Sequence, residues 1–170
     1  MQQILGVDLS SKKIALAFLS VVEVVSPKTQ ETREKLVWRH EKLIINGKGI
    51  YTPEVALQAA ETLPTVLQGQ LPGVAWIEYP CVGVGGPRST IVQAFVSGVV
   101  QSELVKFGWK VNFVNVQTWK KEVIGKGSSS KEQVQSTIDH VFTKAKIKEL
   151  NSDQDLYDAS AIALYGKLHL

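Results

Sequence analysis

The chain has 170 residues, of which 44% are hydrophobic and 21% charged, with a formal net charge of +3. These proportions are those of ordinary globular proteins and exclude a disordered or fibrous chain, and the length fits one domain over residues 1–170. No apolar run reaches the about 18–20 residues that span a bilayer, so no membrane association is expected. The one cysteine, Cys81, excludes an internal disulfide and a multi-cysteine metal site.

The first half of the sequence predicts a meander of three antiparallel strands. The runs expected to be strands are 4–7, 14–25 and 36–45. The first is wholly apolar and ends at Asp8, as in a buried central strand, and the polar segment 26–35 suits an exposed hairpin connection. In the third run, Leu36, Trp38 and His40 alternate with their neighbours, so we expect them on one face of the sheet.

The second half alternates helices with two further strands. The helices are expected at 52–68, 89–107, 117–123, 131–148 and from Ser152 or Asp153 to 167, and the strands at 74–78 and 111–114. A meander followed by alternating helices and strands predicts an α/β fold with a mixed sheet.

Four carboxylates occupy positions where α/β proteins gather ligand sites. Asp8 ends the first strand and Glu78 the fourth, and ligands bind outside the carboxyl ends of strands in open α/β sheets. Asp155 and Asp158 are three residues apart and share one face of the last helix. Asp153, two residues before Asp155, is expected to point elsewhere. We expect the apolar positions of this helix to turn it against the sheet; they are Ala159, Ile162 and Ala163.

Convergence of these carboxylates would raise their pKa values by mutual repulsion, which hard divalent cations relieve. Oxygen ligands select Mg²⁺ or Mn²⁺, and two such ions about 3.5–4 Å apart can activate water and stabilise the leaving oxygen in phosphodiester cleavage. A single Asp after a strand is more often a turn residue, and an Asp pair at a helix start often only stabilises the helix dipole. All four acids together favour a two-metal site.

A lysine-rich segment, residues 110–131, includes the fifth strand and ends at the start of the helix at 131. Its 22 residues hold one acid, Glu122, and five lysines: Lys110, Lys120, Lys121, Lys126 and Lys131. Gly125 and Gly127 permit close backbone approach, and residues 128–130 offer hydroxyl and N–H groups at a helix start. We therefore expect binding to a phosphate backbone, with a solvated surface as the alternative.

Two glycine-containing segments do not match nucleotide sites. The segment around Gly125 lacks the Walker A spacing, and residues 81–89 lack the third glycine of a dinucleotide fingerprint, a place that Arg88 takes. No nucleotide cofactor is expected. Arg88 is expected either to reach DNA from a flexible loop or to lie on a plain surface.

The helix at 89–107 is apolar on more than one face. One expected stripe is Val92, Phe95, Val96 and Val99; Ile91, Ala94 and Val105 lie elsewhere, and Ser97, Gly98 and Ser102 are small. Because small residues let another helix approach, we expect a homodimer interface here, with burial inside the monomer as the alternative.

Trp38, Trp76 and Trp109 are expected in the core, and Trp119 behind the lysines, with base stacking as its alternative.

Four segments of the chain resemble the RuvC-type Holliday junction resolvases of the RNase H-like superfamily. They are ILGVDLSSKKIALAFL, VAWIEYP, VQTWKKEVIGKGSSSKEQVQSTI and DQDLYDASAIALYG. Their order and approximate spacing agree with the family across nearly the whole chain. The TWK triplet and the ending YDASAIALYGK are similar to the plant organellar branch of these enzymes, so a phage or organelle-like branch is suggested.

The resemblance implies a fold, a metal and site residues. The sheet would have three antiparallel strands and then two parallel ones. Asp8, Glu78, Asp155 and Asp158 would be catalytic and bind two Mg²⁺ ions, with Mn²⁺ able to substitute. Lys131 would be catalytic near the scissile phosphate. Lys120 and Lys131 match two family lysines near the scissile phosphate and the DNA backbone, whereas Lys121 and Lys126 have no role shared with the family. The expected DNA-binding residues are Lys120, Lys121, Lys126, Lys131, Arg88 and Ser128.

The implied activity is that of a homodimeric endonuclease that resolves four-way DNA junctions by paired symmetric nicks, in recombination and repair or in phage DNA processing. The alternatives are another RNase H-fold nuclease, acting on flaps, RNA–DNA hybrids or transposon ends, and a non-catalytic junction-binding protein. Bacterial members often carry Phe three residues after the catalytic Glu, where this chain has Cys81. Either Tyr79 or the loop 82–88 would replace it, or the junction would be opened differently. The expected compartment is a bacterial or phage-infected cytoplasm, or an organelle after removal of a transit peptide.

Overall fold

The computed structural model describes residues 2–10, 12–26, 31–45, 52–80, 86–145, 150 and 152–170. Its strands are β1 (Gln2–Leu9), β2 (Lys13–Val25), β3 (Thr32–Ile44), β4 (Val74–Glu78) and β5 (Lys110–Val114). Its helices are α1 (Thr52–Leu67), α2 (Gly86–Lys106), α3 (Val116–Ile124), α4 (Lys131–Ala145) and α5 (Gln154–Leu168).

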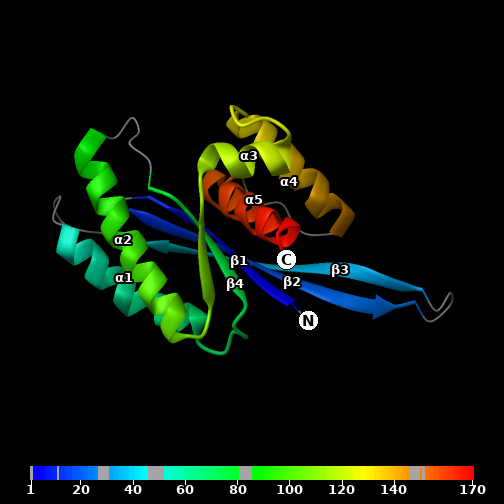
Figure 1. The fold of residues 1–170 in the computed structure, drawn as a ribbon, viewed down its shortest axis with the longest axis horizontal. Helices are drawn as coiled ribbons and strands as arrows, with labels where there is room; N and C mark the ends of the chain where they lie inside the picture. The colour runs from blue at the N-terminus through cyan, green and yellow to red at the C-terminus, as the bar shows by residue number, and fades with distance from the viewer. Residues whose placement is uncertain are drawn as a thin grey trace.

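The strands form a mixed sheet in the order β3-β2-β1-β4-β5. Antiparallel pairing joins β1 to β2 and β2 to β3, whereas β1 pairs with β4 and β4 with β5 in parallel. This arrangement confirms the predicted sheet of three antiparallel and then two parallel strands. Helices α1 and α2 cover one face of the sheet, and α5, with α3 and α4 beside it, covers the other (Figure 1).

Alternation along β1 decides which side chains meet which helices. Leu5 and Val7 belong to the core beneath α1 and α2, whereas Ile4 packs with α5. Because successive side chains of a strand point to opposite faces, Gly6 and Asp8 lie on the α5 side with Ile4. The first strand therefore contributes a carboxylate to the α5 face at its carboxyl end.

The helix α5 approaches the sheet most closely at Gly6. A Cβ added there would lie 2.0 Å from the carbonyl oxygen of Ala159 and 2.5 Å from the backbone nitrogen of Ala163. On β2, the small Ala15 and Ala17 pack against the same part of α5. Small residues on both surfaces thus bring the helix backbone almost onto the strand, as predicted for the apolar positions of this helix.

Two predicted boundaries are wrong. The segment 26–35 is not all connection, because β3 begins at Thr32, where residues 32–35 extend the ladder opposite residues 22–25 of β2. Likewise, α2 begins at Gly86, three residues before the predicted start, so Pro87 lies in its first turn, where the missing N–H of proline costs no helical hydrogen bond.

The buried face of α2 differs from the predicted stripe. The buried apolar residues of this helix are Val92, Val96, Val100 and Leu104. Phe95, grouped with Val92 and Val96 in the predicted stripe, is instead 58% exposed, and at 100° per residue it shares the opposite face with Ile91 and Val105. Although α2 is apolar on two sides, none of the helices in the described ranges is long and apolar enough to cross a membrane.

We predict that Gly6→Ala destabilises the protein by about 1–3 kcal/mol or more, because the added methyl meets backbone atoms of α5 that cannot rotate away. Thermal unfolding with EDTA present would measure the loss. Glu61→Ala, at an exposed position of α1, is the control, because its side chain is solvent-exposed and alanine favours a helix. An unchanged melting temperature for Gly6→Ala would contradict the close approach of α5.

Candidate active site

Two strands and one helix bring the four acids together. On β1, Asp8 shares the α5-facing side with Gly6, which pairs with Trp76 of β4. Glu78, two residues after Trp76 and on the same side of β4, therefore lies beside Asp8. Asp155 and Asp158 lie in the first turns of α5, which pack over this end of the strands. All four carboxylates are partly exposed.

Burial and mutual repulsion raise the pKa of most of these acids. The pKa of Asp8 lies well above its ordinary value, first because of burial and then because of the charges of Glu78, Asp158 and Asp155. Burial also raises the pKa of Glu78 and of Asp158. The four acids thus share one electrostatic environment in which a full set of negative charges is unfavourable.

Asp155 differs from the other acids because two lysines contact it. Burial alone would raise its pKa, but hydrogen bonds and charge from Lys42 and Lys13 lower it. The ammonium nitrogen of Lys42 lies 2.7 Å from Asp155 Oδ2, and that of Lys13 lies 3.2 Å from the same oxygen. Lys42 also bonds both oxygens of Asp153, at 2.7 and 2.6 Å. The prediction that Asp153 points away from Asp155 is therefore wrong, because one lysine holds both carboxylates.

Glu78 is held by a residue of α3. The indole N–H of Trp119 donates a 2.7 Å hydrogen bond to Glu78 Oε2, which opposes the rise of the pKa of this acid. Trp119 is fully buried, so it cannot stack on a base, and the expectation that it packs behind the lysines is the one the structure supports. The other predicted core tryptophans differ in burial: Trp109 is buried, whereas Trp38 and Trp76 pack partly buried beneath α5.

Two of the predicted lysines lie near the acids. The charge of Lys120 lowers the pKa of Glu78 and of Asp158 against the effect of burial, and the charge of Lys131 does the same for Asp158. Lys120 Nζ donates to the carbonyl of Ser129 at 3.2 Å. The end of α3 and the start of α4 therefore place positive charge beside the carboxylates.

Most polar groups of the connection between α3 and α4 form hydrogen bonds with one another or with the ends of these two helices. Gly125 closes α3 with a left-handed backbone, at φ 100°, and its N–H bonds Lys121. At the start of α4, Ser130 and Gln133 bond reciprocally, each side chain with the other's backbone N–H, and the hydroxyl of Ser129 donates to the carbonyl of Lys126. Of the serine hydroxyls expected at a phosphate, only that of Ser128 has no hydrogen bond with the described residues.

The remaining predicted site residues are not in contact with the four acids in any interaction described for this structure. Lys121, Lys126 and Ser128 are exposed. Arg88 is exposed in the first turn of α2, a helix on the other face of the sheet from α5, so it belongs to a helix and not to the flexible loop of the prediction. Tyr79 follows Glu78, is 54% exposed and packs on the ring of Phe113 with centroids 5.0 Å apart. Cys81 and residues 82–85 lie outside the described residues.

The donor chemistry of the site fits divalent cations. Four carboxylates present only oxygen, the donor preferred by Mg²⁺ and Mn²⁺, and their repulsion would be relieved by bound positive charge. In the arrangement described, no three His, Cys, Asp or Glu side chains of the described residues are placed to hold one ion together. One acid of the four, Asp155, is bonded instead to Lys42 and Lys13.

Three contact residues of the site were missed from the sequence: Lys42, Lys13 and Trp119 as a partner of Glu78. The signal for Lys42 was present, because it continues the alternation of Leu36, Trp38 and His40 along β3. His40, on that same face, contacts Ser160 of α5 at 2.9 Å, and burial lowers its pKa to about 4.

The order of this sheet, with helices on both faces, defines an α/β protein of the RNase H-like class. Among curated protein sequences, none matches the chain significantly. A profile of the family Crossover junction endodeoxyribonuclease RuvC matches residues 4–166. The chain therefore belongs to the RuvC family, and it is a hydrolase and a DNA endonuclease of the Holliday junction resolvase type.

Solved structures of resolvases share the fold at low sequence identity. The chain is similar to RuvC of Thermus thermophilus, with 18% identity, a TM-score of 0.72, and coverage of 99% of this chain and 94% of that one. The T. thermophilus RuvC in complex with Holliday junction substrate matches with 18% identity, a TM-score of 0.75 and coverage of 99% and 97%. The yeast mitochondrial Holliday junction resolvase Ydc2 matches with 16% identity, a TM-score of 0.56 and coverage of 95% and 76%.

We predict that Asp8→Asn stabilises the cation-free protein near neutral pH. The raised pKa values of Asp8, Glu78 and Asp158 mean that the folded state binds protons there more tightly than the unfolded chain. The free energy of unfolding should therefore fall as pH rises above their ordinary values of 3.8 for Asp and 4.5 for Glu. Asparagine removes a buried negative charge and weakens this fall.

The measurement is thermal unfolding in EDTA at about pH 4 and about pH 7, where each 1 kcal/mol shifts the melting temperature by about 2–4 °C in a chain of this size. Asp8→Asn should melt above the parent at the higher pH, with a smaller difference at the lower one. Glu61→Gln, at an exposed position of α1, is the control. An Asp8→Asn melting temperature at or below that of the parent at both pH values would contradict the repulsion.

Proposed function

We propose that this protein binds four-way DNA junctions and cuts them by metal-dependent phosphodiester hydrolysis with paired, symmetric nicks. The observation that carries the proposal is the convergence of four carboxylates at the carboxyl ends of β1 and β4, in a chain whose family cuts crossover junctions. The T. thermophilus relative in complex with a Holliday junction has a sheet and helices superposable on those of this chain. Its substrate is the one we propose here.

Asp8, Glu78, Asp155 and Asp158 would hold two Mg²⁺ ions, with Mn²⁺ as a substitute. When bound, such a pair of cations supplies an activated water and stabilisation of the leaving oxygen. The protein itself orients the ligands. Trp119 donates to one oxygen of Glu78, Oε2, and the amide of Gln154 donates to Asp158 Oδ1 at 2.8 Å.

Lys131 and Lys120 would act on the phosphate. Their charges already reach Asp158, so a phosphodiester seated against the acids would lie between carboxylates and ammonium groups. Lys121, Lys126 and Ser128 extend this positive surface along the α3–α4 connection and would contact the DNA backbone, and Arg88 would contact it separately from the start of α2. Contacts with phosphates make binding depend strongly on salt.

Asp8→Asn and Glu78→Gln should each abolish cleavage of a four-way junction in Mg²⁺ while leaving junction affinity largely intact, because the acids serve the reaction and the lysines the binding. Gel assays of an end-labelled junction and of a matched linear duplex, with Mg²⁺, Mn²⁺ or EDTA, give cleavage and affinity together. Glu61→Gln is the matched control and should cut like the parent. Equal loss of binding and cleavage in the two variants would make these acids structural.

The same assay separates the alternatives. Equal cutting of duplex, flap or RNA–DNA hybrid would assign the site to another RNase H-fold activity, and tight junction binding without nicks in either metal would indicate a binding protein.

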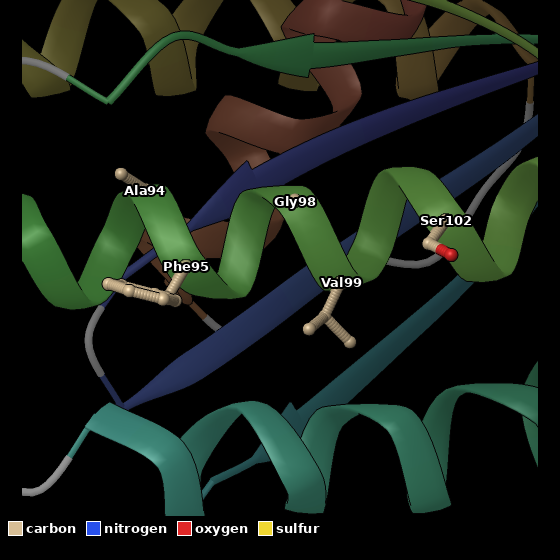
Figure 2. A pocket seen from close by; sticks show the side chains of 5 residues that line it. All are labelled: Ala94, Phe95, Gly98, Val99 and Ser102. Atoms are coloured by element: carbon tan, nitrogen blue, oxygen red, sulfur yellow. The ribbon is translucent and has the colours of Figure 1, made fainter.

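We also propose that the protein is a homodimer joined through α2. On the helix side opposite the core, Ile91 and Val105 are 50% and 56% exposed, and they flank the exposed Phe95. Phe95 also lines a shallow, apolar hollow of about 470 Å³ with Ala94, Gly98, Val99 and Ser102 (Figure 2). These residues recur three or four positions apart, the spacing of a helix that packs on another helix. A two-fold axis would present two active sites to two opposing strands of a symmetric junction.

Phe95→Asp should convert the dimer to a monomer, because a carboxylate would be buried at the centre of the contact. Light scattering coupled to gel filtration at micromolar concentration measures the mass. Leu168→Asp, at a residue 63% exposed at the end of α5 on the other face of the sheet, is the control. A parent of monomeric mass would contradict the interface.

A further inference from the structure

The register of the sheet places a lysine in the same row as the acids. Lys42 of β3 pairs with Ala15 of β2, and Ala15 pairs with Asp8 of β1. Ala15 packs against α5, so all three residues lie on the face that α5 covers. Alanine is short, so the residue between Lys42 and Asp8 in this row has no long side chain.

The ammonium group of Lys42 is surrounded by carboxylate oxygens, as a bound metal cation would be. Its nitrogen lies 2.6 to 2.7 Å from three carboxylate oxygens, two of Asp153 and one of Asp155. Its side chain is only 21% exposed, so it is not one of the solvated surface pairs that contribute little to stability. Lys13 reaches the same Oδ2 atom of Asp155 from β2 at 3.2 Å.

This arrangement occupies one of the four acids, Asp155, with ammonium groups. A carboxylate that bonds two ammonium groups through one oxygen has lost part of its capacity for a divalent cation, and a cation arriving nearby meets like charge. Removing the lysine charge would therefore help an ion to bind, and would leave the cation-free protein with more unbalanced negative charge.

We infer that Lys42, assisted by Lys13, is an internal counter-cation of Asp155 that competes with divalent metal for this carboxylate. The lysine stabilises the metal-free site and sets its metal affinity lower than the four acids alone would give. This inference rests on the metal site of the proposed function. It makes Lys42 a positioning residue that contacts the metal ligand and not the substrate.

The test is titration calorimetry of Mn²⁺ into the 170-residue protein without DNA. Lys42→Met should bind Mn²⁺ about tenfold more tightly than the parent, the effect of removing a unit charge a few ångströms from a divalent ion even at the dielectric constant of water. Its melting temperature in EDTA should fall, and Mn²⁺ should raise it by more than in the parent. Lys42→Arg keeps the charge and should bind Mn²⁺ like the parent.

Lys167→Met is the matched control. It also removes an ion pair between α5 and β3, that of Lys167 with Glu34 at 2.8 Å, but at the opposite end of the helix, so Mn²⁺ affinity should not change. If Lys42→Met does not fold, Lys13→Met replaces it, because this lysine is more exposed, at 44%, and contacts the same oxygen. It should tighten Mn²⁺ binding by a smaller factor.

The outcomes separate this inference from the function on which it rests. No Mn²⁺ binding by the parent, or equal binding by Asp8→Asn, would overturn the proposed metal site itself. Mn²⁺ binding that is lost in Asp8→Asn but unchanged or weaker in a folded Lys42→Met would overturn only the role of Lys42. Tighter binding in Lys42→Arg as well as in Lys42→Met would also overturn it, because the charge would then not be the cause.

Discussion

The contact of α5 with β1 at Gly6 is the constraint on which the site depends. A helix can lie this close to a strand only where the strand has no side chain, and alanines at the facing helix positions complete the fit. The same contact sets the height of the first turns of α5 above the strand ends. Asp155 and Asp158 are thereby brought over Asp8 and Glu78. The four carboxylates repel one another, because they share one partly buried space.

That repulsion is balanced from three sides by groups on different elements. Trp119 of α3 donates to Glu78, the charges of Lys120 in α3 and Lys131 at the start of α4 act on Asp158, and Lys42 of β3 bonds Asp155. Each of these groups would also have a second role in the proposed reaction. The indole orients a ligand, the two lysines face the phosphate, and Lys42 adjusts how strongly the acids attract a divalent cation.

The two helix layers divide the work of the molecule. The layer with α3, α4 and α5 carries Asp155, Asp158, Lys120 and Lys131 and packs over the strand ends with Asp8 and Glu78, whereas α2 in the other layer has one apolar face in the core and a second one exposed. The sheet and α1 together cover only one of the two apolar faces of α2. The other apolar face has no partner among the described residues. The layer opposite the active site thus has the surface through which a second copy would align two sites.

The sequence by itself determined the mixed sheet, the approximate elements, the four acids and the family, because these rest on local periodicity and on residues at fixed spacing. The tertiary structure decided which faces meet. Periodicity along β3 placed Lys42 with Trp38 and His40, but only the register against β2 and the position of α5 set it on Asp155. The exposure of Phe95 and the bond from Trp119 to Glu78 were equally invisible in the sequence. Both depend on contacts between elements distant along the chain, and local residue patterns carry no information about those contacts.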